Sequence, residues 1–319
     1  MLMIMPKLSG IELKTLFGKT VDKENDQVFF NDAEHLYLDK LSGEKYISAT
    51  TLVDKYKNEF NSAFFSKYKA LEALVDSDHF SLVKDGLLAT QIWNPELLTR
   101  FNIDPQVFED KTKEILKSWE DTRDEACDHG TYVHEIMETS FYGNTHFDLS
   151  NFGCPQICGD YACVKGNYHL DLDNGIYPEF LMSYVTPEGL RIAGQADLVV
   201  KNGNDISILD WKTNREIKRR SYYNKTKKKN VMMKYPLNHI EDCNYQHYTL
   251  QLSLYAYILQ KLNPNFNIKE LKIVHIARDG KQTVYDLEYR KNDIERMLKH
   301  YAKSLKTNEL LDRDIPFII

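Results

Sequence analysis

Residues 206–213 place strand-forming residues directly before an acid, an aromatic residue and a lysine, in the order ISILDWKT. Such a branched, apolar run is typical of a buried β-strand. Because side chains alternate between the two faces of a strand, Asp210 and Lys212 project from the same face. Removing an acid and a base from water is costly unless they bind something there. An isolated pair of this kind is more often a solvent-facing ion pair at a strand end, so its neighbours decide its meaning.

Two strands expected immediately upstream each carry an acid of their own. Glu179 lies in the strand predicted for 176–185, and Asp197 lies in the strand predicted for 190–201. Acids on neighbouring strands repel one another and lose hydration unless a cation lies between them. Carboxylate ligands of this kind suit Mg²⁺ or Mn²⁺. The alternatives are a solvated strand face for Glu179 and a strand-end acid for Asp197.

The remaining patterns predict an α/β fold with a mixed central sheet flanked by helices. A turn at 202–205 joins the second and third of the acid-bearing strands as a hairpin. We expect a region over 1–105, made of a small β-hairpin and mostly of helices, to pack on a core over 106–319 that includes a basic loop, 214–244. Further elements are expected as strands at 28–30, 35–38, 45–47, 271–277 and 283–287, and as helices at 61–74, 106–142, 245–262 and 293–305.

Composition limits the class of protein. The chain has 319 residues, 42% of them hydrophobic, which is enough for a large core. Its net charge is −6, so nucleic-acid binding would require a local basic patch. Five cysteines without a disulfide framework favour a reducing compartment. Neither a signal peptide nor a run of about 20 apolar residues is visible, so we expect a cytoplasmic protein without a membrane partner.

The ordered motifs resemble the core of the PD-(D/E)XK nuclease superfamily, in particular its RecB-type exonuclease branch. The resemblance rests on Gly194-x-Ala196-Asp197, on Asp210-x-Lys212-Thr213, on GTYVHE at 130–135 and on QLSLY at 251–255. The pattern over 35–37 and 46–52 is also similar to exonucleases encoded by bacteriophages and to the mitochondrial genome maintenance exonuclease. A phage origin would place the protein in the host cytoplasm.

This resemblance implies a restriction-endonuclease-like core and a Mg²⁺- or Mn²⁺-dependent deoxyribonuclease, an exonuclease acting on DNA ends or single strands. Such enzymes act in DNA processing, recombination, repair or replication and leave 5′-phosphate products. One or two metal ions are expected, and Lys212 would orient or deprotonate the attacking water. The expected metal ligands are His134, Glu179, Asp197 and Asp210.

His134 and the helix at 245–262 depend most on this resemblance. A single helical histidine is more often a surface or core residue, and an amphipathic helix that packs on the sheet explains most of 245–262. The resemblance implies instead that His134 completes the metal site. It also implies that Gln251 and Tyr255 face the cleft and support the lysine or touch the DNA backbone.

A basic segment after the third strand interleaves cations with Tyr222 and Tyr223. Cations stabilise nearby phosphates, and tyrosines stack on bases. A mobile, solvated loop is the alternative. The DNA-binding residues predicted here are Lys218, Arg219, Arg220, Lys227 and Lys228, with Arg215 as a separate phosphate-binding residue.

Cys154, Cys158 and Cys163 raise the question of an iron–sulfur cluster. RecB-type relatives with a cluster place three cysteines after the helix that carries the glutamine and tyrosine. No cysteine follows Tyr255, so we expect no iron–sulfur cluster. A zinc site at these cysteines has little support, because the spacing lacks C-x₂-C.

Other functions fit the same motifs. A structure-specific DNA endonuclease would use the same core. A catalytically inactive DNA-binding accessory protein would keep the fold, although the joint presence of Asp197, Asp210 and Lys212 argues against it. A scaffold that binds protein partners through the basic loop would behave independently of metal.

Overall fold

The computed structural model describes residues 23–24, 27–31, 34–141, 172, 174–225 and 228–313. They form two compact units. The first unit comprises the described residues of 1–57, 130–223 and 229–319, and the second comprises 58–129 with those of 224–228. Cys154, Cys158, Cys163 and Lys227 lie outside the described residues.

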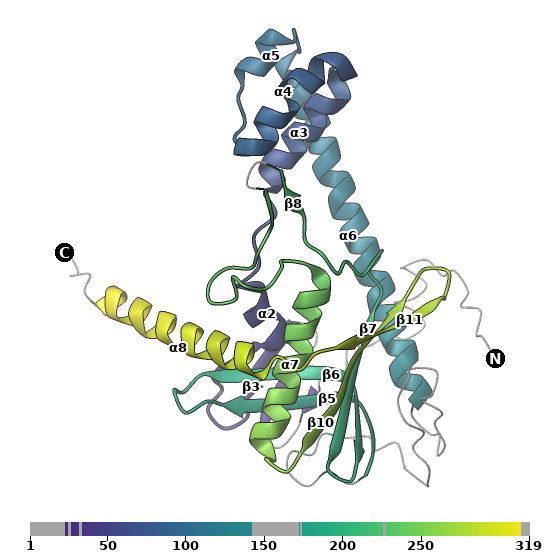
Figure 1. The fold of residues 1–319 in the computed structure, drawn as a ribbon, viewed down its shortest axis with the longest axis vertical. Coiled ribbons are helices and arrows are strands. Elements are labelled where there is room, and N and C mark those ends of the chain that lie inside the picture. The colour runs from purple at the N-terminus through teal and green to yellow at the C-terminus, as the bar shows by residue number, and fades with distance from the viewer. Residues whose placement is uncertain are drawn as a thin grey trace. The chain divides into compact units, whose positions relative to one another are not determined.

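A mixed sheet forms the centre of the first unit (Figure 1). Its strands follow the order β1-β2-β3-β4-β6-β7-β10-β11, and β5 pairs with β6 beside this path. The bounds are β1 (Lys23–Glu24), β2 (Val28–Asn31), β3 (Leu36–Asp39), β4 (Lys45–Ser48), β5 (Gly175–Val185), β6 (Arg191–Asn202), β7 (Asp205–Lys212), β10 (Asn267–Ile276) and β11 (Gln282–Leu287).

Two parallel pairings make the sheet mixed. β4 runs parallel to β6, and β7 runs parallel to β10, whereas the other described pairings are antiparallel. The β6–β7 hairpin turns at Gly203, whose positive φ of 59° is favourable for glycine, as expected from the Asn-Gly turn. Because parallel strands need a crossover, α7 (Asn244–Leu262) lies between β7 and β10 in the chain.

Helices cover both faces of this sheet. On one face, α2 (Ala49–Asp54), α7 and α8 (Lys291–Arg313) bury a continuous apolar core with the strands. On the other face, Val133 and Met137 of α6 (Pro105–Phe141) pack with Leu209 and Trp211 of β7. Trp211 therefore points away from the face that carries Asp210 and Lys212, as strand alternation predicts.

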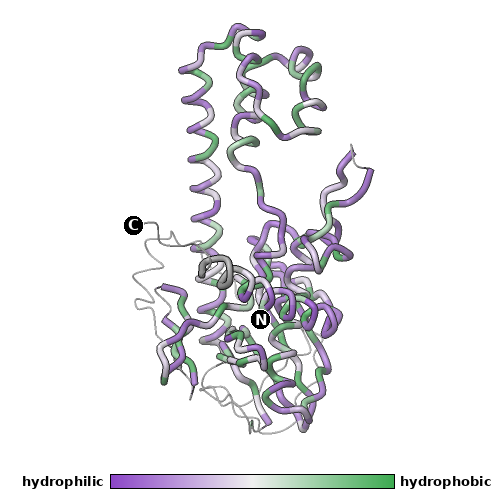
Figure 2. The backbone as a smooth tube through the Cα atoms, turned by 90° about the vertical axis from the view of Figure 1, so that its left-hand side faces the viewer, coloured by the Kyte–Doolittle hydropathy of each residue, from purple (hydrophilic) through white to green (hydrophobic). Residues whose placement is uncertain are grey.

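The second unit is helical. Phe64, Tyr68, Leu71 and Phe80 belong to its core, to which α3 (Ser62–Leu74), α4 (Ser77–Thr90), α5 (Glu96–Arg100) and the first part of α6 contribute. Figure 2 shows the long α6 as mainly hydrophilic, with recurring hydrophobic bands along its length. A separate two-stranded sheet pairs β8 (Tyr223–Asn224) with β9 (Lys229–Asn230).

The structure confirms the expected α/β class, with a restriction-endonuclease-like mixed sheet flanked by helices and preceded by short antiparallel strands and helices. Pro95 is the N-cap of α5, and Pro105 is the first residue of α6, where the missing N–H of proline costs no helical hydrogen bond. No helix in the described part of the chain is long and apolar enough to cross a membrane.

Candidate metal centre

The site lies where two neighbours of β6 diverge. β4 pairs with Ile192 and Ala193 of β6, and β7 begins to pair at Leu198. Between these pairings, residues 194–197 have no ladder partner on that side among the strands that the structure describes. Asp197 bridges the gap with its side chain, because its Oδ2 accepts a hydrogen bond of 2.6 Å from the Trp211 N–H. The carboxylate thereby ties the end of β7 to β6.

Glu179 lies across from Asp197 in the β5–β6 register, between the pairs Pro178–Leu198 and Phe180–Ala196. Its backbone is left-handed, with φ 49°. For a non-glycine residue this conformation costs on the order of 1–2 kcal/mol, and such outliers cluster at functional sites. The Glu179 Oε2 accepts a hydrogen bond from the Gln195 side-chain amide.

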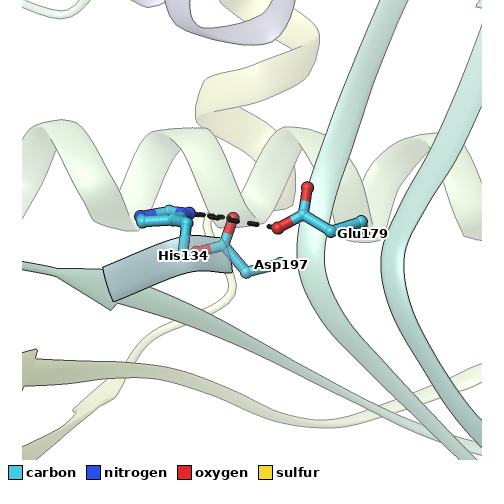
Figure 3. Close-up of side chains that lie close together, drawn as sticks. All are labelled: His134, Glu179 and Asp197. Carbon is cyan, nitrogen blue, oxygen red and sulfur yellow. Dashed lines mark ion pairs between the residues drawn. The ribbon is translucent and has the colours of Figure 1, made fainter. Parts of the chain in front are cut away.

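His134 of α6 completes a cluster with these acids (Figure 3). Its Nδ1 lies 3.4 Å from Asp197 Oδ1 and 4.0 Å from Glu179 Oε1. The three potential ligand atoms all lie within 4.8 Å of one another. The structure thus brings together three of the predicted ligands, from one helix and two strands.

The charges of the cluster favour a cation at its centre. Burial by itself lowers the pKa of His134, but the Asp197 and Glu179 carboxylates outweigh it and raise that pKa to about 9. Burial opposes ionisation of Asp197, yet the neighbouring His134 holds its pKa below the ordinary value. A proton on the imidazole therefore supplies the positive charge that the two acids require.

Asp210 and Lys212 form a buried ion pair at the end of β7. Burial and the Asp197 charge raise the pKa of Asp210 to about 6. Burial alone lowers the pKa of Lys212, but Asp210 and Asp197 more than compensate, so its pKa is raised. In this state Lys212 is an ammonium ion that brings positive charge next to Asp210 and Asp197.

Gln251 and Tyr255 of α7 lie against the same part of β6. The Gln251 Nε2 donates a 3.0 Å hydrogen bond to the Tyr255 hydroxyl. A Cβ added to Gly194 would lie 2.4 Å from Cε1 of Tyr255, so only glycine permits this contact. Burial, followed by the Asp210 charge, keeps the pKa of Tyr255 well above its ordinary value. Tyr255 is buried and forms part of the wall rather than an exposed stacking surface.

Tyr248 is a neighbour of Lys212, and the sequence motifs did not indicate it. The Lys212 Nζ lies 4.8 Å from the centroid of the Tyr248 ring, within the range of a cation–π interaction. The Tyr248 hydroxyl donates a hydrogen bond to Asn214 Oδ1. Its spacing of three and seven residues before Gln251 and Tyr255 places it on the same helix face, a signal that could have identified it.

Gly130 of α6 lies near Thr213, the residue that follows β7. A Cβ at this position would meet Thr213 Oγ1 at 3.4 Å, a close but ordinary contact distance. Val133, three residues later, packs with Trp211. These contacts fix the helix turn that carries His134.

Two described cations of the basic segment are paired with acids. Lys218 pairs with Glu216 at 3.0 Å, and Arg220 pairs with Glu241 at 2.5 Å. Arg219 is exposed and lies between two rings, 5.4 Å from the centroid of Tyr245 and 5.3 Å from that of Tyr285.

The side chain of Asn244 in α7 binds the backbone of this segment. Its Oδ1 accepts from the Lys218 N–H at 2.8 Å, and its Nδ2 donates to the Glu216 carbonyl at 2.9 Å. Of the other predicted cations, Arg215 and Lys228 are exposed.

Comparison with known proteins gives one family match. Residues 165–318 match the model of the PD-(D/E)XK nuclease superfamily. No curated protein matches the chain. Among solved structures, SSO0001 is 14% identical, with a TM-score of 0.34 and coverage of 83% of this chain and 78% of that one. A candidate exonuclease from Eubacterium rectale is 13% identical, with a TM-score of 0.30 and coverage of 83% and 80%. Similarities this distant carry no argument about fold or function.

The family match covers β5, β6, β7 and α7. It therefore includes most residues of the site described above. His134 precedes the matched segment and reaches the cluster through the fold. This match, together with the mixed sheet and the acid cluster described above, supports the assignment of residues 165–318 to the PD-(D/E)XK nuclease superfamily.

Proposed function

We propose that the protein is a Mg²⁺- or Mn²⁺-dependent DNA exonuclease that hydrolyses phosphodiester bonds at DNA ends or in single strands. The observation that carries this proposal is the cluster of His134, Glu179 and Asp197, with Asp210 and Lys212 beside it. An activity of this kind suits DNA processing in recombination, repair or replication.

The donor set fits a hard divalent cation. Two carboxylates and one imidazole offer ligand atoms within 4.8 Å of one another. Asp210 is not one of these three, but it is paired with Lys212 and its charge interacts with that of Asp197, so we assign it as a further ligand. Carboxylate-rich sites suit Mg²⁺ and Mn²⁺. A bound ion would lower the pKa of the attacking water and stabilise charge on the phosphate.

Lys212 has a separate role in this proposal. Its ammonium group, held by Asp210 and by the ring of Tyr248, can orient the attacking water and stabilise negative charge that develops on the phosphate. The raised pKa of Lys212 favours this electrostatic role over proton abstraction.

The basic segment supplies the expected contacts to DNA. Arg219 is best placed, because its two ring contacts hold an exposed guanidinium ready for a phosphate. We also assign contacts with the DNA backbone to Arg215, Lys218, Arg220, Lys227 and Lys228. Gln251 and Tyr255 would support Lys212 or contact the DNA backbone at the cleft.

A substrate comparison tests the reaction. Linear single-stranded DNA labelled at its 5′ or 3′ end should be degraded with Mg²⁺ or Mn²⁺ and should survive in EDTA, whereas a covalently closed circle should remain intact. Cleavage of the circle would replace the exonuclease with an endonuclease on the same core, and cleavage in EDTA would contradict the metal site.

Two lysine variants test the residue assignment. Lys212→Ala should reduce cleavage by about 10³-fold, because transition-state charge stabilisation is lost. Lys117→Ala, in an exposed helical ion pair, is the matched control and should retain full activity. Full activity of the Lys212 variant would remove this residue from the reaction.

A further inference from the structure

The two acids that face His134 use their paired oxygens in the same way. The Asp197 Oδ2 accepts from the Trp211 N–H, and its Oδ1 lies 3.4 Å from the histidine Nδ1. The Glu179 Oε2 accepts from the Gln195 amide, and its Oε1 lies 4.0 Å from the same nitrogen. In each carboxylate, one oxygen is held by a protein donor while the other is directed toward the cluster.

Only one of the two donors depends on the identity of its residue. The donor to Asp197 is a backbone N–H, which nearly any residue at position 211 would supply. The donor to Glu179 is the side chain of Gln195, which is half-buried on β6. Gln195 precedes Asp197 by two residues, so both project from the same face of the strand. It lies opposite Leu181, one diagonal step from Glu179.

An amide suits this position chemically. It donates a hydrogen bond without adding charge, whereas a lysine or arginine would repel a cation and an acid would repel Glu179. The glutamate also needs such support more than an aspartate does, because its longer side chain has more rotamers. Its left-handed backbone, with φ 49°, sets the direction of the side chain only at its base.

We propose that Gln195 is a positioning residue that fixes the Glu179 carboxylate as a ligand for a divalent cation; the inference rests on the proposed metal-dependent function. Gln195 acts through Glu179 and touches neither the ion nor the substrate. Groups that orient metal ligands typically change metal affinity by about 10–100-fold when they are removed.

Metal binding without DNA tests this role independently of catalysis. Titration with Mn²⁺, followed by electron paramagnetic resonance of the free ion, gives a dissociation constant for each variant. Gln195→Met removes the donor and keeps an unbranched side chain, and we expect its Kd for Mn²⁺ to rise by about 10-fold or more. Gln260→Met is the matched control, since the Gln260 amide donates to the Phe266 carbonyl in a half-buried setting of α7, and its Kd should equal that of the wild type.

A double-mutant cycle separates positioning from a general structural effect. In a Glu179→Gln background, the further change Gln195→Met should leave the Kd unchanged, because the carboxylate through which Gln195 acts is already lost. Circular dichroism checks folding. If Gln195→Met does not fold, Gln195→Asn provides the same test, because its amide is one methylene too short to reach Glu179.

The outcomes distinguish the inference from the proposed function. Wild-type Mn²⁺ affinity in a folded Gln195 variant, or additive effects in the cycle, would overturn the positioning role while leaving the nuclease proposal intact. A wild-type protein that binds no Mn²⁺ and cleaves no DNA would overturn the proposed function, and the inference would fall with it.

Discussion

Lysines pair with acids in both units of the protein, but in opposite surroundings. In the second unit, Lys113 lies 2.7 Å from Glu109, and the two side chains are 65% and 59% exposed. In the first unit, Lys212 and Asp210 are only 16% and 1% exposed. Exposed pairs contribute little to stability, whereas the cost of removing a buried pair from water can exceed the attraction between its charges. A fold that keeps the buried pair beside further acids gives up stability there, which is typical of a functional site.

Glycines show the same contrast between the units. Gly86 of α4 has no heavy atom within 4 Å of an added Cβ, whereas Gly194 of β6 has the Tyr255 ring at 2.4 Å. The first glycine is a weakness of a helix, and the second is a requirement of packing. The same residue type is therefore unfavourable in one unit and required in the other, depending on the atoms that surround it.

The largest expected difference between the units is in activity. Asp197→Asn should lower DNA cleavage by about 10³-fold or more, because it removes the negative charge shared with His134 while its amide oxygen can still accept from Trp211. Asp121→Asn, in an exposed pair with Lys117, should retain wild-type activity. Initial rates on end-labelled DNA measure both, and equal rates would remove the distinction between buried and exposed acids.

The glycines should differ in the sign of their effect on the free energy of unfolding. Gly194→Ala forces its Cβ against Tyr255 and should destabilise the protein by about 1–3 kcal/mol. Gly86→Ala improves helix propensity in open space and should stabilise its unit by up to about 1 kcal/mol. Denaturant unfolding, followed by far-ultraviolet circular dichroism, measures the two changes. A stable, active Gly194→Ala protein would show that the Tyr255 ring can move.

Backbone strain at Glu179 predicts a smaller difference in the free energy of unfolding, between two variants of this residue. Because φ is 49° there, Glu179→Gly should be more stable than Glu179→Ala by about 1 kcal/mol, although both lack the carboxylate. Both variants should also bind Mn²⁺ more weakly than the wild type. Equal stability of the two would mean that the backbone relaxes once the carboxylate is removed.

Local sequence patterns predicted the elements of the site better than their assembly. Alternation along 206–213 placed Asp210 and Lys212 on one face, and the structure pairs them. The hairpin turn between Asn202 and Asp205 also follows from local chemistry. Both features depend on the alternation of side chains along a strand or on the type of turn, and residues close together in the sequence determine these.

Contacts between distant segments could not be predicted in the same way. The left-handed backbone of Glu179 has no local sequence signal, since glutamate rarely adopts it. Likewise, the charge of Arg220 is balanced by Glu241, 21 residues away, so a count of cations overstated the free positive charge of the basic segment. Such pairings exist only after the chain has folded.

The smallest expected effect is the coupling within an exposed pair. A double-mutant cycle on Glu109 and Lys113 should give no more than about 0.5 kcal/mol, and less at high salt, because water and ions screen both charges. Denaturant unfolding of the two single variants and the double variant measures this coupling. A value above 1 kcal/mol, independent of salt, would mean that the second unit relies on its surface pairs, and burial would then no longer separate structural from functional charges in this protein.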